Sequence, residues 1–358
     1  MRGPRAYSLP TPRWAGSGYP RMKAVALRTP AGIDSLDLVE RDDAKAPGRG
    51  EIRVRVHANS LNYHDLAVVL GMLPTADGRI PLSDGAGIVE AVGEGVTEFK
   101  TGDSVFSCFF PGWLNGEPTV SDFSTTPGDG VDGYARERVV CPGSWFTHAP
   151  LGYSHTEAAT LTTAAVTAWR ALVVNGGLKA GDSVLVLGTG GVSTFALQFA
   201  KSMGATVITT SSSDEKIERA RILGADHTVN YQRHKDWAAQ VLELTDGRGV
   251  DHVLEVGGPD TLPQSIRACR VGGHIALIGV LTGFGGVIPT AALMQRQQRL
   301  LGLIVGNRQH QIDMVRGIEA GGVKPVIERT FALRDIRDSF RFLQSARHVG
   351  KICLEVAS

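Results

Sequence analysis

The sequence predicts an α/β protein in which a mostly β domain precedes a doubly wound parallel sheet. Up to about residue 140 the apolar runs are short and are separated by Gly, Pro and Asp turns, which is typical of β structure. From residue 183 onward, apolar strands alternate with amphipathic helices, which favours βαβ units and a parallel sheet. With 358 residues, the chain is long enough for two domains of ordinary size.

Residues 1–21 are expected to form a disordered N-terminal tail, since they hold four arginines, four prolines and no acidic residue. They lack the apolar stretch of a secretory signal. An organellar transit peptide and an upstream start site both stay open as explanations of this segment. Folded sequence is expected to begin near Met22.

The first domain is expected to span residues 22–150. Its predicted strands are residues 23–27, 51–58, 85–93, 103–108 and 134–140. The second domain is expected to span residues 151–307, with six strands that mostly alternate with helices. Those strands are predicted at 183–188, 206–210, 227–231, 251–258, 273–280 and 300–306, and the helices between them at 191–204, 214–224, 234–245 and 259–270. Residues 308–358 contain a helical stretch and an alternating last strand at 350–356, which predicts a return to the first domain.

Charge and composition exclude several classes of protein. The chain has 37 Lys and Arg against 36 Asp and Glu, so no broad positive field would attract nucleic acid. Hydrophobic residues make up 42%, and no window reaches the roughly 18–20 uninterrupted apolar residues of a membrane-spanning helix. Cys108, Cys141, Cys269 and Cys353 form no CxxC pair, which favours a reducing, cytoplasmic location.

A glycine-rich turn follows the predicted strand at 183–188 and opens a helix. Gly188, Gly190, Gly191 and Val192 stand where the backbone must bend sharply and let a pyrophosphate approach the amides of a helix N-terminus. Ser193 replaces the third glycine of this G-x-G-x-x-G pattern, which is expected to loosen the packing of helix against strand slightly. Together with the six alternating strands, the turn predicts a dinucleotide-binding domain of the Rossmann type.

The end of the second strand of this domain predicts the choice of cofactor. An Asp or Glu there would accept hydrogen bonds from the ribose 2′-hydroxyl of NAD. The strand ends instead in three hydroxyl side chains, Ser211, Ser212 and Ser213, and the first carboxylate is Asp214. With Lys216 and Arg219 nearby, these hydroxyls favour the 2′-phosphate of NADP(H) over NAD(H). A serine cap on the next helix is a second interpretation that is compatible with the first.

These residues resemble the medium-chain dehydrogenase/reductase superfamily over about residues 23–356. The motifs that carry the resemblance are 62–65 (NYHD), 81–87 (PLSDGAG), 102–103 (GD), 162–172 (TTAAVTAWRAL), 181–182 (GD) and the glycine turn. The resemblance implies a GroES-like β domain, a Rossmann domain and a return to the first. It also implies a homodimer in which Rossmann edge strands pair, and the apolar run 300–306 suits that edge.

The zinc ligands of the superfamily are missing. Its zinc-dependent alcohol dehydrogenases place Cys, then His, then Cys or an acid where this chain has Asn62, Ser83 and Thr163. Amide and hydroxyl groups are poor replacements for the thiolate and imidazole that zinc prefers. The stretch 108–133 holds one cysteine where the superfamily's structural zinc needs four, and the ten histidines show no HxxxH or HExxH spacing. We therefore expect no metal.

Without zinc, the resemblance points to the branch that includes quinone oxidoreductases and enoyl reductases. It implies an NAD(P)H-dependent oxidoreductase that transfers hydride from NADPH to a quinone or an α,β-unsaturated carbonyl, a small molecule bound between the domains. Two alternatives stay open. One is an NAD(P)-dependent alcohol dehydrogenase or carbonyl reductase that works without zinc, and the other is an NADPH-binding protein with a structural or scaffolding role.

Tyr63 and Asn62 are the catalytic candidates. Tyr63 is suited to donate a hydrogen bond or a proton to the substrate carbonyl, or else it lines the cleft as an aromatic residue. Asn62 offers its amide to the substrate or to the nicotinamide ribose, or else it caps a helix. His64 suits a proton relay or a ribose contact equally and is not assigned to catalysis. The resemblance pairs Asp65 with Lys351.

The other cofactor candidates come from the resemblance and from strand ends. Thr167 matches the family position that contacts the nicotinamide ring, and Thr163 is a further cofactor candidate. Tyr231 resembles a residue beside the adenosine phosphate, and ordinary packing is the alternative for Thr167 and Tyr231. The ends of the fifth and sixth strands border the binding crevice of such sheets. They contribute Ile278, Gly279, Val280, Val305, Gly306 and Asn307.

Overall fold

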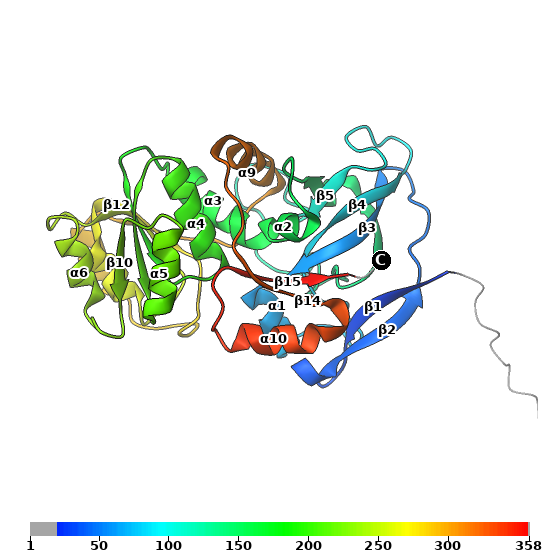
Figure 1. Ribbon diagram of the computed structural model, residues 1–358, viewed down its shortest axis with the longest axis horizontal. Coiled ribbons are helices and arrows are strands. Elements are labelled where there is room, and N and C mark those ends of the chain that lie inside the picture. The colour runs from blue at the N-terminus through cyan, green and yellow to red at the C-terminus, as the bar shows by residue number, and fades with distance from the viewer. Residues whose placement is uncertain (1–19, 357–358) are drawn as a thin grey trace, which may run out of the picture.

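The computed structural model describes residues 20–356 (Figure 1). The tail expected at 1–21 lies outside the described residues except for Pro20 and Arg21. Arg21 already begins the first strand, β1 (Arg21–Leu27), one residue before the predicted start of folded sequence.

The first domain contains two sheets. In the smaller, β1 pairs antiparallel with β2 (Leu36–Asp42). The larger has the strand order β14-β15-β3-β4-β5-β7, with β6 also paired to β3. Its strands are β3 (Glu51–Ser60), β4 (Asp84–Val92), β5 (Ser104–Ser107), β6 (Arg138–Pro142), β7 (Phe146–His148), β14 (Ile327–Ala332) and β15 (Lys351–Glu355). The last two come from the C-terminal segment, so the chain returns to the first domain as the alternation of 350–356 predicts.

The second domain is a six-stranded parallel sheet with the order β10-β9-β8-β11-β12-β13. Its strands are β8 (Ser183–Leu187), β9 (Thr206–Ser211), β10 (His227–Asn230), β11 (Val250–Glu255), β12 (Cys269–Leu277) and β13 (Arg299–Gly302). The direction of winding reverses between β8 and β11, and ligands of open α/β sheets bind outside the strand ends at such a switch point. The glycine turn lies there, directly after β8.

Helices cover both faces of the parallel sheet because alternate strand residues point to opposite sides. Val184 and Val186 share a core with Phe195 and Phe199, whereas Leu185 packs on the other face with the second helix layer. The helices of this domain are α4 (Gly191–Ser202), α5 (Asp214–Ile222), α6 (Trp237–Glu243), α7 (Leu262–Ala268) and α8 (Thr290–Gln295). The predicted fold class, a Rossmann sheet beside a GroES-like β domain, is confirmed.

A nearly continuous helical run joins the two domains. It consists of α2 (His155–Ala159), a π-helical turn (Leu161–Ala165), α3 (Val166–Trp169) and a second π-helical turn (Arg170–Val174). Its beginning packs on β3 and β4 and its middle packs on α4. The other helical elements are α1 (Tyr63–Val69), α9 (Arg308–Gly321), α10 (Ile336–Gln344) and short 3₁₀ turns at Ile33–Ser35, Gly143–Trp145 and Leu333–Asp335.

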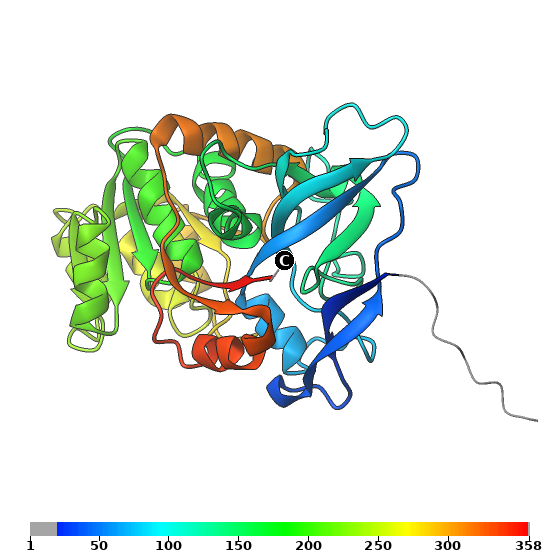
Figure 2. The same cartoon turned by 45° about the vertical axis from the view of Figure 1, so that its right-hand side comes forward.

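The predicted domain boundaries stay predictions. The helix α9, which begins at the expected boundary after residue 307, packs against α3 and α4 and also against β7. Figures 1 and 2 show the chain continuing from α9 into β14, α10 and β15, which bring it back beside β3 and α1. The strands β2, β7 and β14 were absent from the prediction.

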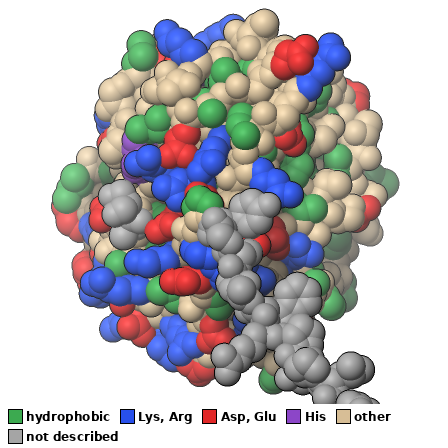
Figure 3. Space-filling model, turned by 90° about the vertical axis from the view of Figure 1, so that its right-hand side faces the viewer, with side chains coloured by type: hydrophobic (Ala, Val, Ile, Leu, Met, Phe, Trp, Pro, Cys, Tyr) green, Lys and Arg blue, Asp and Glu red, His purple; other side chains and the backbone are tan. Residues whose placement is uncertain are grey.

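The surface agrees with the nearly balanced charge of the sequence. Basic and acidic side chains are interspersed over the face drawn in Figure 3. Within residues 20–356, the structure has no helix that is both long and apolar enough to cross a membrane. All four cysteines are buried and free.

Candidate active site

The glycine turn connects β8 to α4 as a dinucleotide-binding turn requires. Gly188 has φ +73°, a left-handed conformation that L side chains rarely adopt, and its N–H donates to Thr210 O of the next strand at 2.9 Å. Gly190 is the N-cap of α4, whose first amides have no helical acceptor. A Cβ on Gly190 would meet nothing within 4 Å, so the space in front of this N-terminus is open for a phosphate.

Gly191 is needed for a different reason. A Cβ at this position would lie 2.4 Å from Cδ of Lys351, the first residue of β15. The preceding residue, Gly350, donates its N–H to Thr189 O at 2.9 Å. The C-terminal segment therefore supports the back of the turn, and Lys351 runs past the glycine into the junction of the two domains.

Ser193 replaces the third glycine of the pattern and was expected to loosen the packing of helix against strand. The structure accommodates the serine without disturbing this packing. Its hydroxyl donates to Leu187 O at 2.7 Å, and the residue is buried. The hydroxyl thereby takes up a carbonyl at the end of β8. Next to it, Val192 is half-buried and packs against the core formed by α3 and α4.

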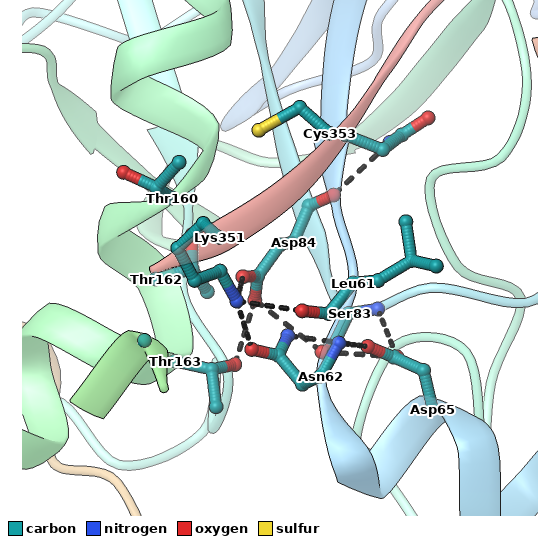
Figure 4. Close-up of polar contacts among 12 residues, drawn as sticks. Leu61, Asn62, Asp65, Ser83, Asp84, Thr160, Thr162, Thr163, Lys351 and Cys353 are labelled. Carbon is teal, nitrogen blue, oxygen red and sulfur yellow. Dashed lines mark hydrogen bonds and ion pairs between the residues drawn. The ribbon is translucent and has the colours of Figure 1, made fainter. Parts of the chain in front are cut away.

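Lys351 is the centre of a buried polar cluster (Figure 4). Its ammonium donates to Leu61 O at 2.7 Å and to Asn62 Oδ1, and it lies 3.9 Å from Asp84 Oδ2. Thr163 donates its hydroxyl to Asp84 Oδ1 at 2.6 Å. Burial raises the pKa of the Asp84 carboxyl to about 6 although Lys351 opposes the shift, and burial lowers the pKa of Lys351.

The prediction that Asp65 pairs with Lys351 is wrong, because each residue has other partners. Asp65 forms a capping box at the start of α1, where its Oδ2 accepts the Asn62 N–H at 2.9 Å. Its other oxygen accepts the Ser83 N–H at 3.0 Å. Asp65 is thus saturated by backbone donors, and the ammonium goes to Asn62 and Asp84 instead.

The residues at the three zinc positions do not fit a zinc ion. Asn62 and Thr163 direct their oxygens at Lys351 and Asp84, and the Ser83 hydroxyl lies within reach of two carboxylates. An amide and two hydroxyls lack the thiolate and imidazole donors that zinc selects. Across the part of the chain that the structure describes, no cluster of three His, Cys, Asp or Glu side chains is arranged to hold a metal.

Residues predicted to bind the adenosine end of the cofactor lie together after β9. Tyr231 N–H donates to Ser211 O at 3.1 Å, and half-buried Ser212 follows. Ser213 caps α5 by accepting the Lys216 N–H at 3.3 Å, so the helix-cap interpretation is confirmed. The Lys216 ammonium donates to Ala346 O at 2.6 Å, and burial lowers its pKa.

The other charged side chains near these serines already have hydrogen-bond or ion-pair partners. Asp214 accepts from Asn230 Nδ2 at 2.8 Å and pairs with Arg233, which neutralises the first carboxylate after β9. Arg219, the other cation considered for a 2′-phosphate, forms an ion pair with Glu328 at 2.5 Å. Lys216 is the remaining cation of the predicted set.

The ends of β12 and β13 form two tightly constrained loops. A Cβ on Gly279 would lie 2.0 Å from Val256 O, and one on Gly306 would lie 2.7 Å from Val166 Cγ1. Ile278 packs against the core of α3 and α4, whereas Val280 is 47% exposed. Each loop therefore brings its backbone close to the junction of the domains.

Val305 and Asn307 are held by residues from other elements. Val305 has φ +46°, rare for a β-branched residue, and Arg170 donates to Ile304 O at 3.1 Å and to Val305 O at 3.4 Å. Asn307 caps α9 and donates its side-chain amide to Gly116 O at 3.1 Å. Thr167, buried in α3, donates to Thr163 O at 2.7 Å.

Tyr63 and His64 follow Asn62 at the start of α1. Tyr63 is 43% exposed, and burial of the remainder raises the pKa of its phenol. His64 lies between Phe109 and Phe123, and its ring centroid is 5.1 Å from that of Phe109 and 4.6 Å from that of Phe123. Its Nε2 lies 3.4 Å from Asp129 Oδ2. The sequence analysis assigned no role to Asp129 or Arg170. The only signal for Asp129 was its place between two glycines in an insertion without a readable motif.

A parallel sheet with a glycine turn at its switch point, facing a polar cluster of a second domain, defines a two-domain dinucleotide-dependent oxidoreductase. Two family models match the chain: the alcohol dehydrogenase GroES-like domain over residues 48–151 and the zinc-binding dehydrogenase over residues 191–319. A zinc-type alcohol dehydrogenase-like protein of Schizosaccharomyces pombe is 42% identical over 336 residues, which cover 91% of this chain and 96% of that protein. The chain belongs to the medium-chain dehydrogenase/reductase superfamily.

Solved structures agree with this assignment. A protein of Sinorhizobium meliloti 1021, provisionally described as an alcohol dehydrogenase, has TM-score 0.88 and 41% identity and covers 94% of this chain and 99% of its own. An NAD-dependent alcohol dehydrogenase has TM-score 0.84 at 33% identity, with 94% and 100% covered. A quinone oxidoreductase of Pseudomonas syringae pv. Tomato DC3000 has TM-score 0.78 at 30% identity, with 94% and 100% covered. The chain is an NAD(P)H-dependent oxidoreductase.

Proposed function

We propose that the protein is a zinc-independent reductase that uses NADPH to reduce a quinone or an α,β-unsaturated carbonyl compound. One observation carries the proposal: Asn62, Ser83 and Thr163, at the three zinc positions, are engaged with Lys351, Asp84 and Asp65 rather than free to bind a metal. In a zinc-dependent alcohol dehydrogenase, the metal stabilises the alkoxide that develops during oxidation of the alcohol. Reduction of a conjugated carbonyl spreads the negative charge, so that hydrogen-bond donors suffice.

Different residues bind the pyrophosphate, the nicotinamide and the substrate carbonyl in this proposal. The turn at Gly188 to Gly191 and the N-terminus of α4 bind the pyrophosphate, and Thr163, Thr167, Val280 and Val305 border the nicotinamide. When bound, the nicotinamide supplies the hydride. Tyr63 donates a hydrogen bond to the substrate carbonyl. Because its phenol pKa is raised, Tyr63 keeps its proton at neutral pH and acts as a donor of a hydrogen bond more readily than of the proton itself.

Asn62 is included in the proposed site through Lys351. Both ends of its amide are engaged, Oδ1 by the Lys351 ammonium and Nδ2 by Asp65 at 3.1 Å. Asn62 therefore holds the ammonium and the start of α1 in place beside the reacting groups.

NADP(H) is the proposed cofactor. Ser211, Ser212 and Tyr231 surround the expected 2′-phosphate, Lys216 supplies a positive charge, and the carboxylate of Asp214 is neutralised by Arg233. The test is the affinity for NADPH and NADH before and after Ser211→Asp, because a carboxylate there should repel a 2′-phosphate. Equal affinity of the parent protein for both cofactors would refute the assignment.

Two relatives are named as alcohol dehydrogenases, one of them as zinc-type. The second candidate is therefore an alcohol dehydrogenase or carbonyl reductase, which in this chain would work without zinc. A screen of enones, quinones, aldehydes and alcohols with metal analysis separates the two. Oxidation of alcohols that disappears with a chelator contradicts zinc independence. Tight NADPH binding without turnover of any compound would instead favour a structural role.

We also propose that the protein is a cytoplasmic homodimer. The edge strand β13 exposes 43% of Leu301, and in the segment between β12 and α8 Phe284 and Val287 are 80% and 88% exposed. An apolar sheet edge invites pairing with a second copy. Light scattering on the parent and on Leu301→Lys tests this, and a monomeric parent at micromolar concentration excludes it.

A further inference from the structure

We propose that His64 is the proton donor of the reaction and that Asp129 is the carboxylate that positions it. The inference rests on the proposed function, since the reduction of a conjugated carbonyl or quinone consumes a proton together with the hydride. Neither residue was predicted from the sequence to act in catalysis.

The contact between the two side chains is the first observation. His64 Nε2 lies 3.4 Å from Asp129 Oδ2, and the two side chains are only 14% and 9% exposed. A carboxylate removed from water is costly unless a donor compensates it. Within residues 20–356, His64 is the one ion-pair partner of this carboxylate and no side-chain hydrogen bond reaches it. His64 Nε2 is buried and makes no hydrogen bond with any described residue, so Asp129 is the charged group that it faces.

The position of Asp129 is fixed by its neighbours in the chain. Gly128 has φ +89°, and a Cβ there would lie 2.6 Å from Leu82 N; a Cβ on Gly130 would lie 2.1 Å from Ser124 O. Thr75 donates its hydroxyl to Asp129 O at 2.7 Å. The two glycines let this segment press against other backbone, so the backbone that carries the carboxylate is fixed in place, as a positioning group requires.

The two rings beside His64 restrict it further. Phe109 meets it edge-on and Phe123 lies against it at a tilt, so the imidazole plane is set by packing. Within the described part of the chain neither ring nitrogen makes a hydrogen bond. Nε2 is buried beside Asp129, whereas Nδ1 is absent from the buried atoms without a partner and is therefore the accessible nitrogen. The accessible nitrogen belongs to the residue after Tyr63, the proposed ligand of the substrate carbonyl.

The proposed step adds one hydride and one proton to the substrate. Hydride addition to the β-carbon moves the electron pair of the C=C bond toward the carbonyl oxygen and gives an enolate, to which Tyr63 donates a hydrogen bond. The Nδ1–H bond of the His64 imidazolium breaks, and its proton forms a bond with the α-carbon. The neutral imidazole that remains keeps its Nε2–H directed at Asp129, and water returns the proton to Nδ1. A quinone takes the same proton on oxygen.

The experiment compares the parent protein with His64→Gln and Asp129→Asn, using NADPH and a 2-methyl-substituted cyclic enone in D₂O. General acid catalysis contributes about 10²–10⁴-fold. We expect kcat to fall on the order of 10²-fold in His64→Gln and about tenfold in Asp129→Asn, with KM little changed. The parent should place deuterium on one face of the α-carbon, and His64→Gln on both faces, because water then supplies the deuteron.

Controls separate chemistry from folding. The exposed His234→Gln should leave kcat unchanged. Thermal unfolding and NADPH binding of each variant report structural damage, and added imidazole should restore turnover in His64→Ala, which repair of packing would not. Parent-like kcat with one-face deuteration in His64→Gln overturns the proposal while the reductase function stands. If the parent reduces neither enones nor quinones, both fail together.

Discussion

The contact between Gly191 and Lys351 gives the most direct test of the site. In Gly191→Ala, the new Cβ would lie 2.4 Å from Lys351 Cδ, which is 1.0 Å short of the 3.4 Å at which ordinary contact begins. The ammonium of Lys351 is anchored at Leu61 O and Asn62 Oδ1, so the side chain cannot move without losing these bonds. Overpacking costs about 1–3 kcal/mol, and each hydrogen bond to a charged group about 1.5–3 kcal/mol.

We therefore expect Gly191→Ala to lose about 3 kcal/mol of stability, or roughly 6 °C in Tm at about 2 °C per kcal/mol. Differential scanning calorimetry measures the shift, and fluorescence titration measures NADPH affinity. The matched control is Gly190→Ala, whose Cβ meets nothing within 4 Å. It should keep its Tm and lose only affinity, since its methyl group points into the phosphate space.

A double-mutant cycle identifies the cause. Lys351→Ala removes the atom that the new methyl group meets, so in that background Gly191→Ala should cost less than about 1 kcal/mol. The same loss of Tm in both backgrounds would refute the reasoning, because the clash would then lie elsewhere. An unchanged Tm for Gly191→Ala alone would refute it as well.

Two further predictions concern stability. Burial lowers the pKa of His274 from 6.5 to about 4, so between these values the unfolded chain binds a proton that the folded chain does not. Stability should therefore fall by roughly 3 kcal/mol as the pH falls from 6.5 to 4, and His274→Phe should flatten the curve of Tm against pH; an unaltered slope contradicts this. Asn307→Ala should lose about 1 kcal/mol by removing the cap of α9, and Asn307→Asp should keep the cap while losing the bond to Gly116 O. Equal Tm values for the parent and both variants would show that neither contact matters.

Most of the fold could be predicted from the periodicity of apolar residues in the sequence. All six strands of the parallel sheet and the four predicted helices were found at the expected places. Five of the strands and all four helices bury residues on one face or both and so leave a regular apolar pattern. The edge strand β13 buries no residue and was predicted from its apolar sequence alone. The three missed strands leave no such pattern. In β2 only Leu36 is buried, β7 has three residues, and β14 is an edge strand without a buried residue. Their pairing depends on partners far away in the sequence.

Part of the candidate site could likewise be predicted from the sequence, and part could not. The glycine turn could be predicted because a local backbone requirement leaves a local signature. Its support by Lys351 could not, because the contact joins residues about 160 positions apart. The pairing of Asp65 was predicted wrongly because its carboxylate satisfies nearby backbone N–H groups, which leaves the lysine to Asp84. Asp129 lies 65 positions from His64 in a stretch without a motif, so only the folded chain brings them together.

The buried cluster also limits where the substrate can be activated. Lys351 is a cation in contact with Asn62, one of the residues at the superfamily's zinc positions, but Leu61 O and Asn62 Oδ1 accept from it and Asp84 lies 3.9 Å away. Its charge is therefore largely balanced before any substrate arrives, and burial further disfavours the ammonium. An oxyanion would have to break these contacts to use it. The donors at the start of α1 carry no such commitment, since Tyr63 is 43% exposed and His64 has an accessible nitrogen. The proposed donors thus lie on α1 beside the buried cluster, which supports the proposal that the substrate is a conjugated acceptor rather than an alcohol.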